Sequence, residues 1–281
     1  MGLINSLLPK KIKPISRDIG FYIKSLLYRF RRGSFNIEKE LIFILGNQKS
    51  GTSAIASLLG KYTNQKTSID LFYSGFNYKV FEMWKKKELS TTSFVKKNNI
   101  EFASKIIKEP HLSVFYNELK KEFTDARFIF IVRNPVDNIR SILDRLGIDG
   151  SLDKLNATEL KKIFHSWNLV FNNQWLGLEN GSFIENLAYR WNYITDIYLD
   201  NQDSVILVKY EDFLLDKEEC IAKLAEKLNL EKVNSINDVL DYSFQPKGKS
   251  KSINKIDFFG KENLKIINSI CKKGMNRLDY T

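Results

Sequence analysis

The stretch that decides the fold is Leu41–Leu59, which reads LIFILGNQKSGTSAIASLL. An apolar run meets a turn that contains Gly46, and a polar string of Lys-Ser-Gly-Thr-Ser precedes a second apolar segment. This order predicts a buried strand, a loop and the N-terminus of a helix. Backbone N–H groups at a helix N-terminus are unpaired and carry the positive end of the dipole, so we expect the loop to bind phosphate or sulfate.

The position of the lysine in this loop argues against a nucleotide kinase. The kinase loop reads G-x-x-x-x-G-K-[ST], with its lysine directly after the second glycine. Gly46 and Gly51 have that spacing, but Thr52 occupies the lysine position and Lys49 lies two residues before Gly51. The sequence therefore disfavours ATP or GTP hydrolysis.

The string Lys-Ser-Gly-Thr-Ser resembles the 5′-phosphosulfate loop of the sulfotransferases, the enzymes that use 3′-phosphoadenylyl sulfate (PAPS). The family pattern is roughly [KR]-S-G-T-[TS], and every position of this chain's string matches it. The resemblance implies that the string binds the nucleotide through Lys49, Ser50, Gly51, Thr52 and Ser53.

A second motif lies in the stretch RFIFIVRNPVDNIRSILDR, residues 127–145. Phe128–Val132 is expected to be a buried strand, and the Asn-Pro pair that follows is expected to start a helix. The segment resembles the family's 3′-phosphate motif, R-[DN]-P-x-D-x-x-x-S, which implies that Arg133 and Ser141 hold the 3′-phosphate. Arg145 matches a further basic contact in part of the family. Arginine suits this role because its planar fork meets two phosphate oxygens at once.

Three weaker matches extend the resemblance over about residues 40–281. Val205–Leu214 is similar to the family's [RK]YEDL segment, which implies that Tyr210 lies near the adenine. Leu187–Tyr198 fits its tryptophan-containing helix. The family's C-terminal basic loop folds over the nucleotide, which here implies Lys247 and Lys249, although the usual R-K-G-x-x-G string is absent.

The resemblance implies in-line transfer of a sulfuryl group from PAPS to a hydroxyl or amine, with PAP as the product and no metal. Charge grows on the bridging oxygen of the leaving phosphate, and a cationic group aimed there stabilises it. Lys49 is the first candidate. Lys108, at the end of a strand candidate, matches a second lysine of many family members, and its alternative role is an ion pair with Glu109.

Three residues compete as the general base that takes the acceptor proton. Asp70 lies twenty residues after Ser50, close to the offset of a glutamate in the protein-tyrosine and carbohydrate-type, carboxylate-base branch, which this chain resembles most in motif style. His111 follows Lys108 by three positions, whereas the small-molecule branch has histidine at two. Glu109 is the third, but it is adjacent to Lys108 and would point the other way on a strand. Asp70 is preferred, His111 comes second, and other residues including Glu82 stay open.

Composition leaves two further classes open. The chain has 281 residues, a formal charge of +11 and a pI near 9.4, which suits an anionic ligand such as PAPS but fits nucleic acid or an anionic membrane equally well. The alternatives to a sulfotransferase are a P-loop small-molecule kinase and a non-catalytic, basic membrane- or polyanion-binding protein. The preferred hypothesis includes no nucleic acid and takes a small-molecule, carbohydrate, lipid or peptide acceptor.

Residues 1–36 are interpreted as a basic amphipathic extension, followed by one domain at 37–281. The extension packs on the domain or makes peripheral contact with a membrane. No run of about 20 apolar residues and no convincing signal peptide is present. Two cysteines and two histidines lack the spacing of a metal site, and a reduced, cytoplasmic location is the simplest expectation.

Alternating strands and helices predict a three-layer, P-loop-like α/β fold, with a central, mostly parallel sheet and helices on both faces. Both phosphate motifs then fall at the carboxyl ends of strands, where ligands bind in such sheets. Short helices and loops are expected in residues 63–104, which together with residues 146–180 are expected to shape the acceptor site. The expected strands are Leu41–Gly46, Ala103–Lys108, Phe128–Val132 and Val205–Val208, and the main expected helices are Gly51–Tyr62, Leu112–Phe123, Pro135–Leu146, Leu215–Leu228 and Lys261–Lys273.

Overall fold

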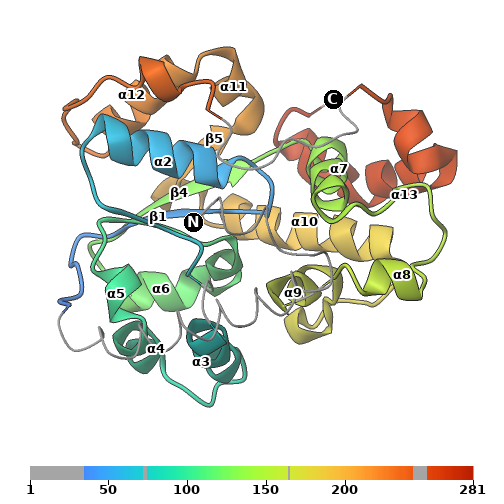
Figure 1. The fold of residues 1–281 in the computed structure, drawn as a ribbon, viewed down its shortest axis with the longest axis horizontal. Helices are drawn as coiled ribbons and strands as arrows, with labels where there is room; N and C mark the ends of the chain where they lie inside the picture. Colours follow the sequence, from blue (N-terminus) through green and yellow to red (C-terminus); the bar gives the residue numbers. More distant parts are fainter. Residues whose placement is uncertain (1–34, 72–74, 164, 243–251, 281) are drawn as a thin grey trace, which may run out of the picture.

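A five-stranded, all-parallel sheet forms the centre of the protein (Figure 1). The computed structural model describes residues 35–71, 75–163, 165–242 and 252–280. The strand order is β2-β3-β1-β4-β5, so β1 is the central strand. The chain between β1 and the helix that follows it, residues 47–51, is called the phosphate loop below. The strands are β1 (Ile42–Gly46), β2 (Thr67–Ile69), β3 (Ile106–Lys108), β4 (Arg127–Val132) and β5 (Ile206–Lys209).

Alternating side chains along the strands form two cores, because successive residues of a strand point to opposite faces of the sheet. Phe43 and Phe130 belong to the larger core, which includes residues of α7 (Pro135–Leu146), α10 (Phe183–Leu199) and α13 (Lys255–Arg277). Ile44 and Ile131 belong to the smaller core, with residues of α2 (Thr52–Tyr62) and α12 (Lys217–Lys227). Helices thus cover both faces, and the predicted three-layer α/β fold is confirmed.

The remaining helices are short and connect the layers. Most lie on the side of the larger core, between β2 and β4 or between β4 and β5 along the chain (Figure 1). They are α3 (Gly75–Lys85), α4 (Thr91–Lys97), α5 (Asn99–Phe102), α6 (Tyr116–Glu122), α8 (Ala157–Leu160), α9 (Asn168–Phe171) and α11 (Tyr210–Leu215), with 3-10 turns η3 (Pro110–Phe115), η4 (His165–Trp167), η5 (Gln174–Leu176), η6 (Gln202–Ser204) and η7 (Asn237–Val239).

The structure corrects the sequence prediction in four places. Strand β2 was missed, because three residues with partly exposed side chains show neither a long apolar run nor a clear alternation. The expected helix Leu112–Phe123 is divided into η3 and α6, and the expected strand from Ala103 begins only at Ile106. The last helix begins at Lys255, and Gly260 interrupts its helical backbone with φ 70°.

Two predictions fall outside the described residues. They concern a membrane role for residues 1–36, of which the structure describes only 35 and 36, and the nucleotide contacts of Lys247 and Lys249. Within the part of the chain that the structure describes, no helix combines the length and apolarity needed to cross a bilayer. The same residues contain no cluster of three or more His, Cys, Asp or Glu side chains suited to a metal ion.

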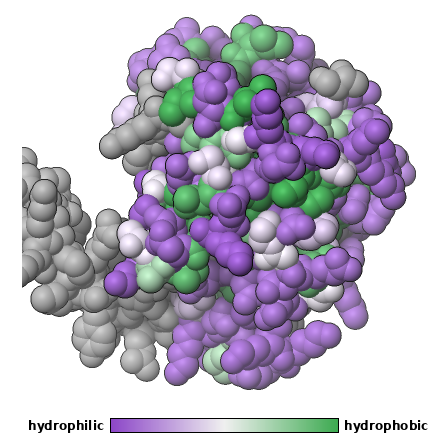
Figure 2. All heavy atoms as spheres, turned by 90° about the vertical axis from the view of Figure 1, so that its right-hand side faces the viewer, coloured by the Kyte–Doolittle hydropathy of each residue, from purple (hydrophilic) through white to green (hydrophobic). Residues whose placement is uncertain are grey.

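Figure 2 shows the face on which α13 lies. Hydrophilic side chains cover most of it, and apolar ones gather in a band across the middle. A shallow hollow of about 630 Å³ on α13 is lined by Ile256 and Leu264 between three lysines, Lys261, Lys265 and Lys272. This surface lies on the outer side of the helical layer and contains none of the predicted site residues.

Candidate active site

Strand β1 ends in a tightly packed turn that leads into the phosphate loop. Gly46 has φ 131°, and a Cβ atom there would lie 2.2 Å from the carbonyl oxygen of Ile131 on β4. The Gly46 N–H donates to Ser113 Oγ at 2.9 Å, and that hydroxyl lies 3.1 Å from the Gly46 carbonyl oxygen. Only glycine fits here, and Ser113 on η3 fixes the point at which the chain leaves the sheet.

The N-terminus of α2 is built to receive an anion. Its N-cap, Gly51, is left-handed with φ 93°, no side chain caps the helix, and its first turn contains no acidic residue. The ring of Tyr210 covers Gly51 so closely that a Cβ atom would lie 2.2 Å from it. The positive end of the α2 dipole therefore has no carboxylate from the helix's own first turn to compensate it.

Helix α7 is hydrogen-bonded to the phosphate loop. Asn138 Nδ2 donates to the Gln48 carbonyl oxygen at 2.8 Å and to Ser50 Oγ at 3.0 Å. Arg133, just before α7, donates through Nη1 to the Lys49 carbonyl oxygen at 2.9 Å, and its guanidinium lies 4.7 Å from the centre of the Tyr210 ring. These contacts make the two sequence motifs one structural unit.

Local capping explains why α7 begins where it does. Asn134 accepts through Oδ1 from the N–H groups of Val136 and Asp137, and Pro135 occupies the first helical position. Ser141 and Arg145 follow Asn138 at spacings of three and seven, so the three residues share one face of the helix. Ser141 is half-buried and Arg145 is exposed.

Several cations converge on Lys49. Burial, together with the nearby charges of Arg145, Arg133 and Lys108, lowers the pKa of its ammonium to about 8, against an opposing contribution from Asp144. Lys49 also has a left-handed backbone with φ 67°, a strained conformation for a non-glycine residue that is concentrated at functional sites. The concentration of positive charge suits a ligand with several negative charges.

Asp70 and Lys108 meet at the carboxyl ends of two neighbouring strands. Ile69 on β2 is in register with Lys108 on β3, so Asp70 follows at the same edge of the sheet and its N–H donates to the Lys108 carbonyl oxygen at 3.0 Å. Their side chains form an ion pair in which Lys108 is 3% exposed and Asp70 is 53% exposed. The structure thus pairs Lys108 with Asp70 rather than with Glu109, which caps η3 by accepting from the His111 N–H.

The candidate base His111 is buried beneath the loop. Its side chain is 4% exposed, and Nδ1 lies 3.3 Å from Nε2 of Gln48. Burial holds the pKa of the imidazole well below its ordinary value, and the charges of Arg190, Lys108 and Lys85 add to this shift. A neutral, enclosed imidazole of low basicity is a poor acceptor for a substrate proton.

Three polar residues that hold the phosphate loop, or Gly46 directly before it, through hydrogen bonds were not predicted from the sequence: Arg190, Asn138 and Ser113. Arg190 on α10 is 1% exposed, donates to the Leu169 carbonyl oxygen at 3.1 Å and lies 3.5 Å from Oε1 of Gln48, and burial lowers its pKa to about 10. Asn138 could have been found from the sequence, because it lies at helical spacing from the predicted site residues Ser141 and Arg145. Arg190 and Ser113 have no comparable pattern in the sequence around them.

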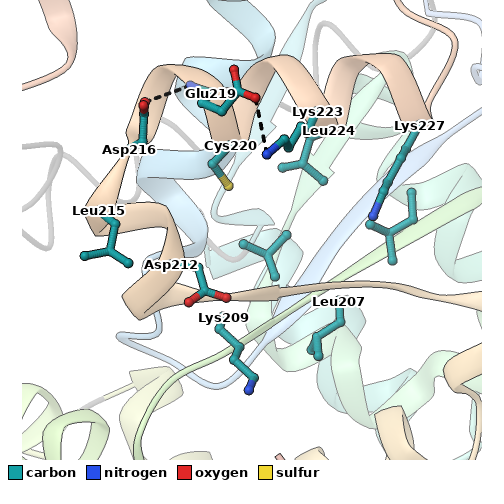
Figure 3. A pocket seen from close by; sticks show the side chains of 12 residues that line it. Leu207, Lys209, Asp212, Leu215, Asp216, Glu219, Cys220, Lys223, Leu224 and Lys227 are labelled. Carbon is teal, nitrogen blue, oxygen red and sulfur yellow. Dashed lines mark hydrogen bonds and ion pairs between the residues drawn. The ribbon is translucent and has the colours of Figure 1, made fainter.

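A separate cavity of about 310 Å³ lies between edge strand β5 and helix α12 (Figure 3). Its wall contains Cys220, whose thiol has a pKa raised to about 11 by burial, and the exposed Leu215. Lys209 points away from α12 in this view. The cavity belongs to the smaller core's side and includes none of the predicted catalytic residues.

The comparisons with known proteins identify the family. The model of the "Sulfotransferase domain" family matches residues 39–275. The chain belongs to the sulfotransferase family. The sulfotransferase therefore uses PAPS as its sulfuryl donor, and neither the kinase hypothesis nor the non-catalytic one is retained. Acceptors of this family include small molecules, in agreement with the coarser part of the acceptor prediction.

Solved structures similar to this sulfotransferase are distant in sequence. The sulfotransferase STF9 from Mycobacterium avium is 13% identical, with 91% of this chain and 80% of the other covered and a TM-score of 0.49. Mouse sulfotransferase SULT7A1 complexed with PAP is 16% identical, with 89% of each chain covered and a TM-score of 0.48. These scores are low, so the family assignment rests on the family model. Comparison with curated proteins gave no match.

Proposed function

We propose that the sulfotransferase binds PAPS across the two motifs, with the 5′-phosphosulfate on residues 49–53 and the 3′-phosphate at Arg133 and Ser141. The convergence of Lys49, Arg133 and Arg145 on one loop supports this assignment more than any other observation. The loop also offers the uncapped N-terminus of α2, whose N–H groups suit a phosphate. Tyr210, which contacts Gly51 and Arg133, lies between the two phosphate positions and is proposed to contact the adenosine.

Lys49 and Lys108 are proposed to neutralise the charge that develops as the sulfur–oxygen bond to the leaving 5′-phosphate breaks. Lys108 is almost fully buried, and an ammonium in such a site acts more strongly on nearby charge than one in water. The sulfuryl group forms its new bond to the acceptor oxygen or nitrogen, and PAP leaves with the electron pair of the broken bond. Neither lysine exchanges a proton in this scheme.

Asp70 is proposed as the general base that removes the acceptor proton. Its carboxylate is more than half exposed, contacts Lys108 and lies at the same sheet edge as the phosphate loop. Like Lys49, it has a left-handed backbone, with φ 61°. The low basicity of His111 supports Asp70 further, and we propose that His111 positions Gln48 instead.

The acceptor is proposed to be a small molecule with a hydroxyl or amine that reaches Asp70 from the side of α3. Lys85 on α3 lies 5.4 Å from the ring centre of the half-buried Trp175, so an apolar ring and polar side chains meet there. Glu82 and Tyr78 lie on the same helix, one turn and two turns before Lys85, and burial raises the pKa of Tyr78 to about 12. A screen of sugar, phenol, lipid and peptide hydroxyls tests which acceptors turn over.

Calorimetric titration tests the nucleotide assignment directly. We expect PAP to bind without metal and more tightly than ADP, because only PAP offers a 3′-phosphate to Arg133. Arg133→Ala should weaken PAP binding at least about tenfold, the loss of a charge-assisted hydrogen bond. Arg127→Ala, an exposed arginine at the opposite end of β4, is the matched control. A preference for ATP with Mg²⁺, or unchanged PAP affinity in Arg133→Ala, would refute the assignment.

A further inference from the structure

A carboxylate lies next to the proposed 3′-phosphate site, yet it does not pair with the arginine there. Glu211 follows Tyr210 at the start of α11, and Oε1 accepts from the Asn134 N–H at 2.9 Å. Asn134 is the residue directly after Arg133, so Glu211 holds the turn that carries the arginine. The Arg133 side chain forms no ion pair among the described residues; its guanidinium donates to the Lys49 carbonyl oxygen and lies over the Tyr210 ring.

The second oxygen of Glu211 is occupied by the C-terminal part of the chain. The Tyr280 hydroxyl donates to Oε2 at 2.8 Å, across 69 positions of sequence. Tyr280 is 8% exposed, and burial together with the charge of Glu211 raises the pKa of its phenol, so the hydroxyl stays protonated and donates.

Other contacts fix the Tyr280 ring in this position. The Tyr280 N–H donates to the Met275 carbonyl oxygen at 2.9 Å, and the ammonium of Lys209 lies 5.5 Å from the ring centre. Lys209 also pairs with Asp279 at 3.7 Å. Figure 3 shows the Lys209 side chain extending to the side of β5 away from α12, although Lys209 also lines the cavity beneath that helix.

We propose that Tyr280 is a positioning residue for nucleotide recognition: its hydroxyl holds the Glu211 carboxylate away from Arg133 and so leaves the guanidinium available to the 3′-phosphate. Both carboxylate oxygens are used, one by Asn134 and one by Tyr280. Without the hydroxyl, Oε2 loses its partner, and the charge of Glu211 already acts on the half-buried guanidinium of Arg133. An internal ion pair there competes with the phosphate for the same guanidinium.

The proposal rests on the assignment of the 3′-phosphate to Arg133, and its test separates the two. We expect Tyr280→Phe to raise the Kd of PAP about five- to tenfold, the loss of one hydrogen bond to a charged group, while the Kd of ADP changes less than about twofold. Tyr62→Phe, a buried tyrosine at the opposite end of α2 from the phosphate loop, is the control. Failure of wild-type protein to bind PAP would overturn the proposed function and this inference with it, whereas PAP binding that Tyr280→Phe leaves unchanged would overturn only the inference.

A rescue variant distinguishes positioning from a loss of stability. Glu211→Gln keeps an oxygen for the Asn134 N–H but removes the negative charge that competes for Arg133. The double variant Tyr280→Phe/Glu211→Gln should therefore bind PAP within about twofold of Glu211→Gln alone. Unchanged PAP affinity in Tyr280→Phe would overturn the proposal. An equal loss of PAP and ADP affinity, or a double variant that is not rescued, would do the same.

Discussion

Two residues with strained backbones carry the proposed chemistry. Lys49 and Asp70 both have left-handed φ values, which cost free energy for residues with a side chain and are retained only where the surrounding structure enforces them. At Lys49, the enforcing contact is the hydrogen bond from Arg133 to its carbonyl oxygen. At Asp70, it is the hydrogen bond from its N–H to the Lys108 carbonyl oxygen. Each strained residue is therefore fixed by a neighbouring strand end.

The depressed pKa of Lys49 predicts a pH dependence. Below about 8 the ammonium is charged and suited to its proposed role in binding the donor, and above about 8 this charge is lost. We expect kcat/KM for PAPS, which reports the free enzyme, to fall as pH rises through about 8. Lys49→Arg should lose this fall because a guanidinium stays protonated. A flat profile in wild-type protein would contradict the low pKa of Lys49. A fall that is identical in the arginine variant would assign the titration to another group.

The same pKa shift has a consequence for folding with a definite sign. The pKa of Lys49 is lower in the folded protein than its ordinary value of 10.5, so the unfolded chain binds more protons between about 8 and 10.5. Stability contributed by this group therefore rises with pH across that window. Activity and stability are expected to change in opposite directions there.

Exchanging the candidate bases separates their roles. Asp70→Asn should lower kcat at least about a hundredfold, the size of a general-base contribution, while PAP still binds. His111→Gln should lower kcat less than about tenfold, because His111 is proposed only to position Gln48. Single-turnover kinetics with saturating PAPS measures both. Full turnover in Asp70→Asn, combined with its loss in His111→Gln, would transfer the role to His111.

At the scale of elements, α7 and the phosphate loop act together through Asn138. This buried side chain donates both of its amide hydrogens to the loop, to Gln48 and Ser50. Gln48 and Ser50 lie 90 and 88 positions before Asn138 in the sequence. The helix that begins at Asn134 and Pro135 thus also fixes a distant loop. The two proposed phosphate positions are linked because one amide contacts both elements.

Removing that amide should weaken nucleotide binding. We expect Asn138→Ala to raise the Kd of PAP about tenfold or more, because the loop loses two hydrogen bonds that hold its backbone. Asn98→Ala is the control, since Asn98 is equally buried and donates to the Phe94 carbonyl oxygen on α4. If both variants lose stability while only Asn138→Ala loses PAP affinity, the effect lies in the loop. Equal PAP affinity in both variants would contradict the prediction.

At the scale of the whole molecule, the aromatic core behind β1 holds the central strand in place. Phe43 is fully buried, and its ring lies 5.2 Å from that of Phe128 and 5.7 Å from that of Phe123. These rings come from β1, from β4 and from the residue after α6. Phe43 and Ile44 point to opposite faces of β1. The position of the phosphate loop relative to β4 therefore depends on the packing of these aromatic rings on the Phe43 face.

Truncating Phe43 should destabilise the whole protein. We expect Phe43→Ala to lower the free energy of unfolding by about 3–5 kcal/mol through lost burial and a cavity. Leu215→Ala, with a side chain that is 87% exposed, should stay within about 0.5 kcal/mol of wild-type protein. Urea denaturation followed by circular dichroism measures both. Similar losses in the two variants would show that Phe43 lies outside the cooperative core.

The sequence by itself determined the fold class and the family, and it predicted the residues that form the phosphate loop. Those features are local: an apolar run, a glycine turn and a helix start lie within one stretch, Leu41–Leu59. Their signals depend on spacing between near neighbours, so a reader of the sequence can find them. The Arg133 motif is local in the same sense.

Only the tertiary structure decided which distant residues meet. The ion pair of Asp70 with Lys108 depends on the register of β2 with β3, and β2 is too short to be predicted from its pattern. The contacts of Asn138 with Gln48 and of Tyr280 with Glu211 join positions that are 90 and 69 apart. Strand register and helix docking are set by packing of the entire sheet, which no local window of sequence contains.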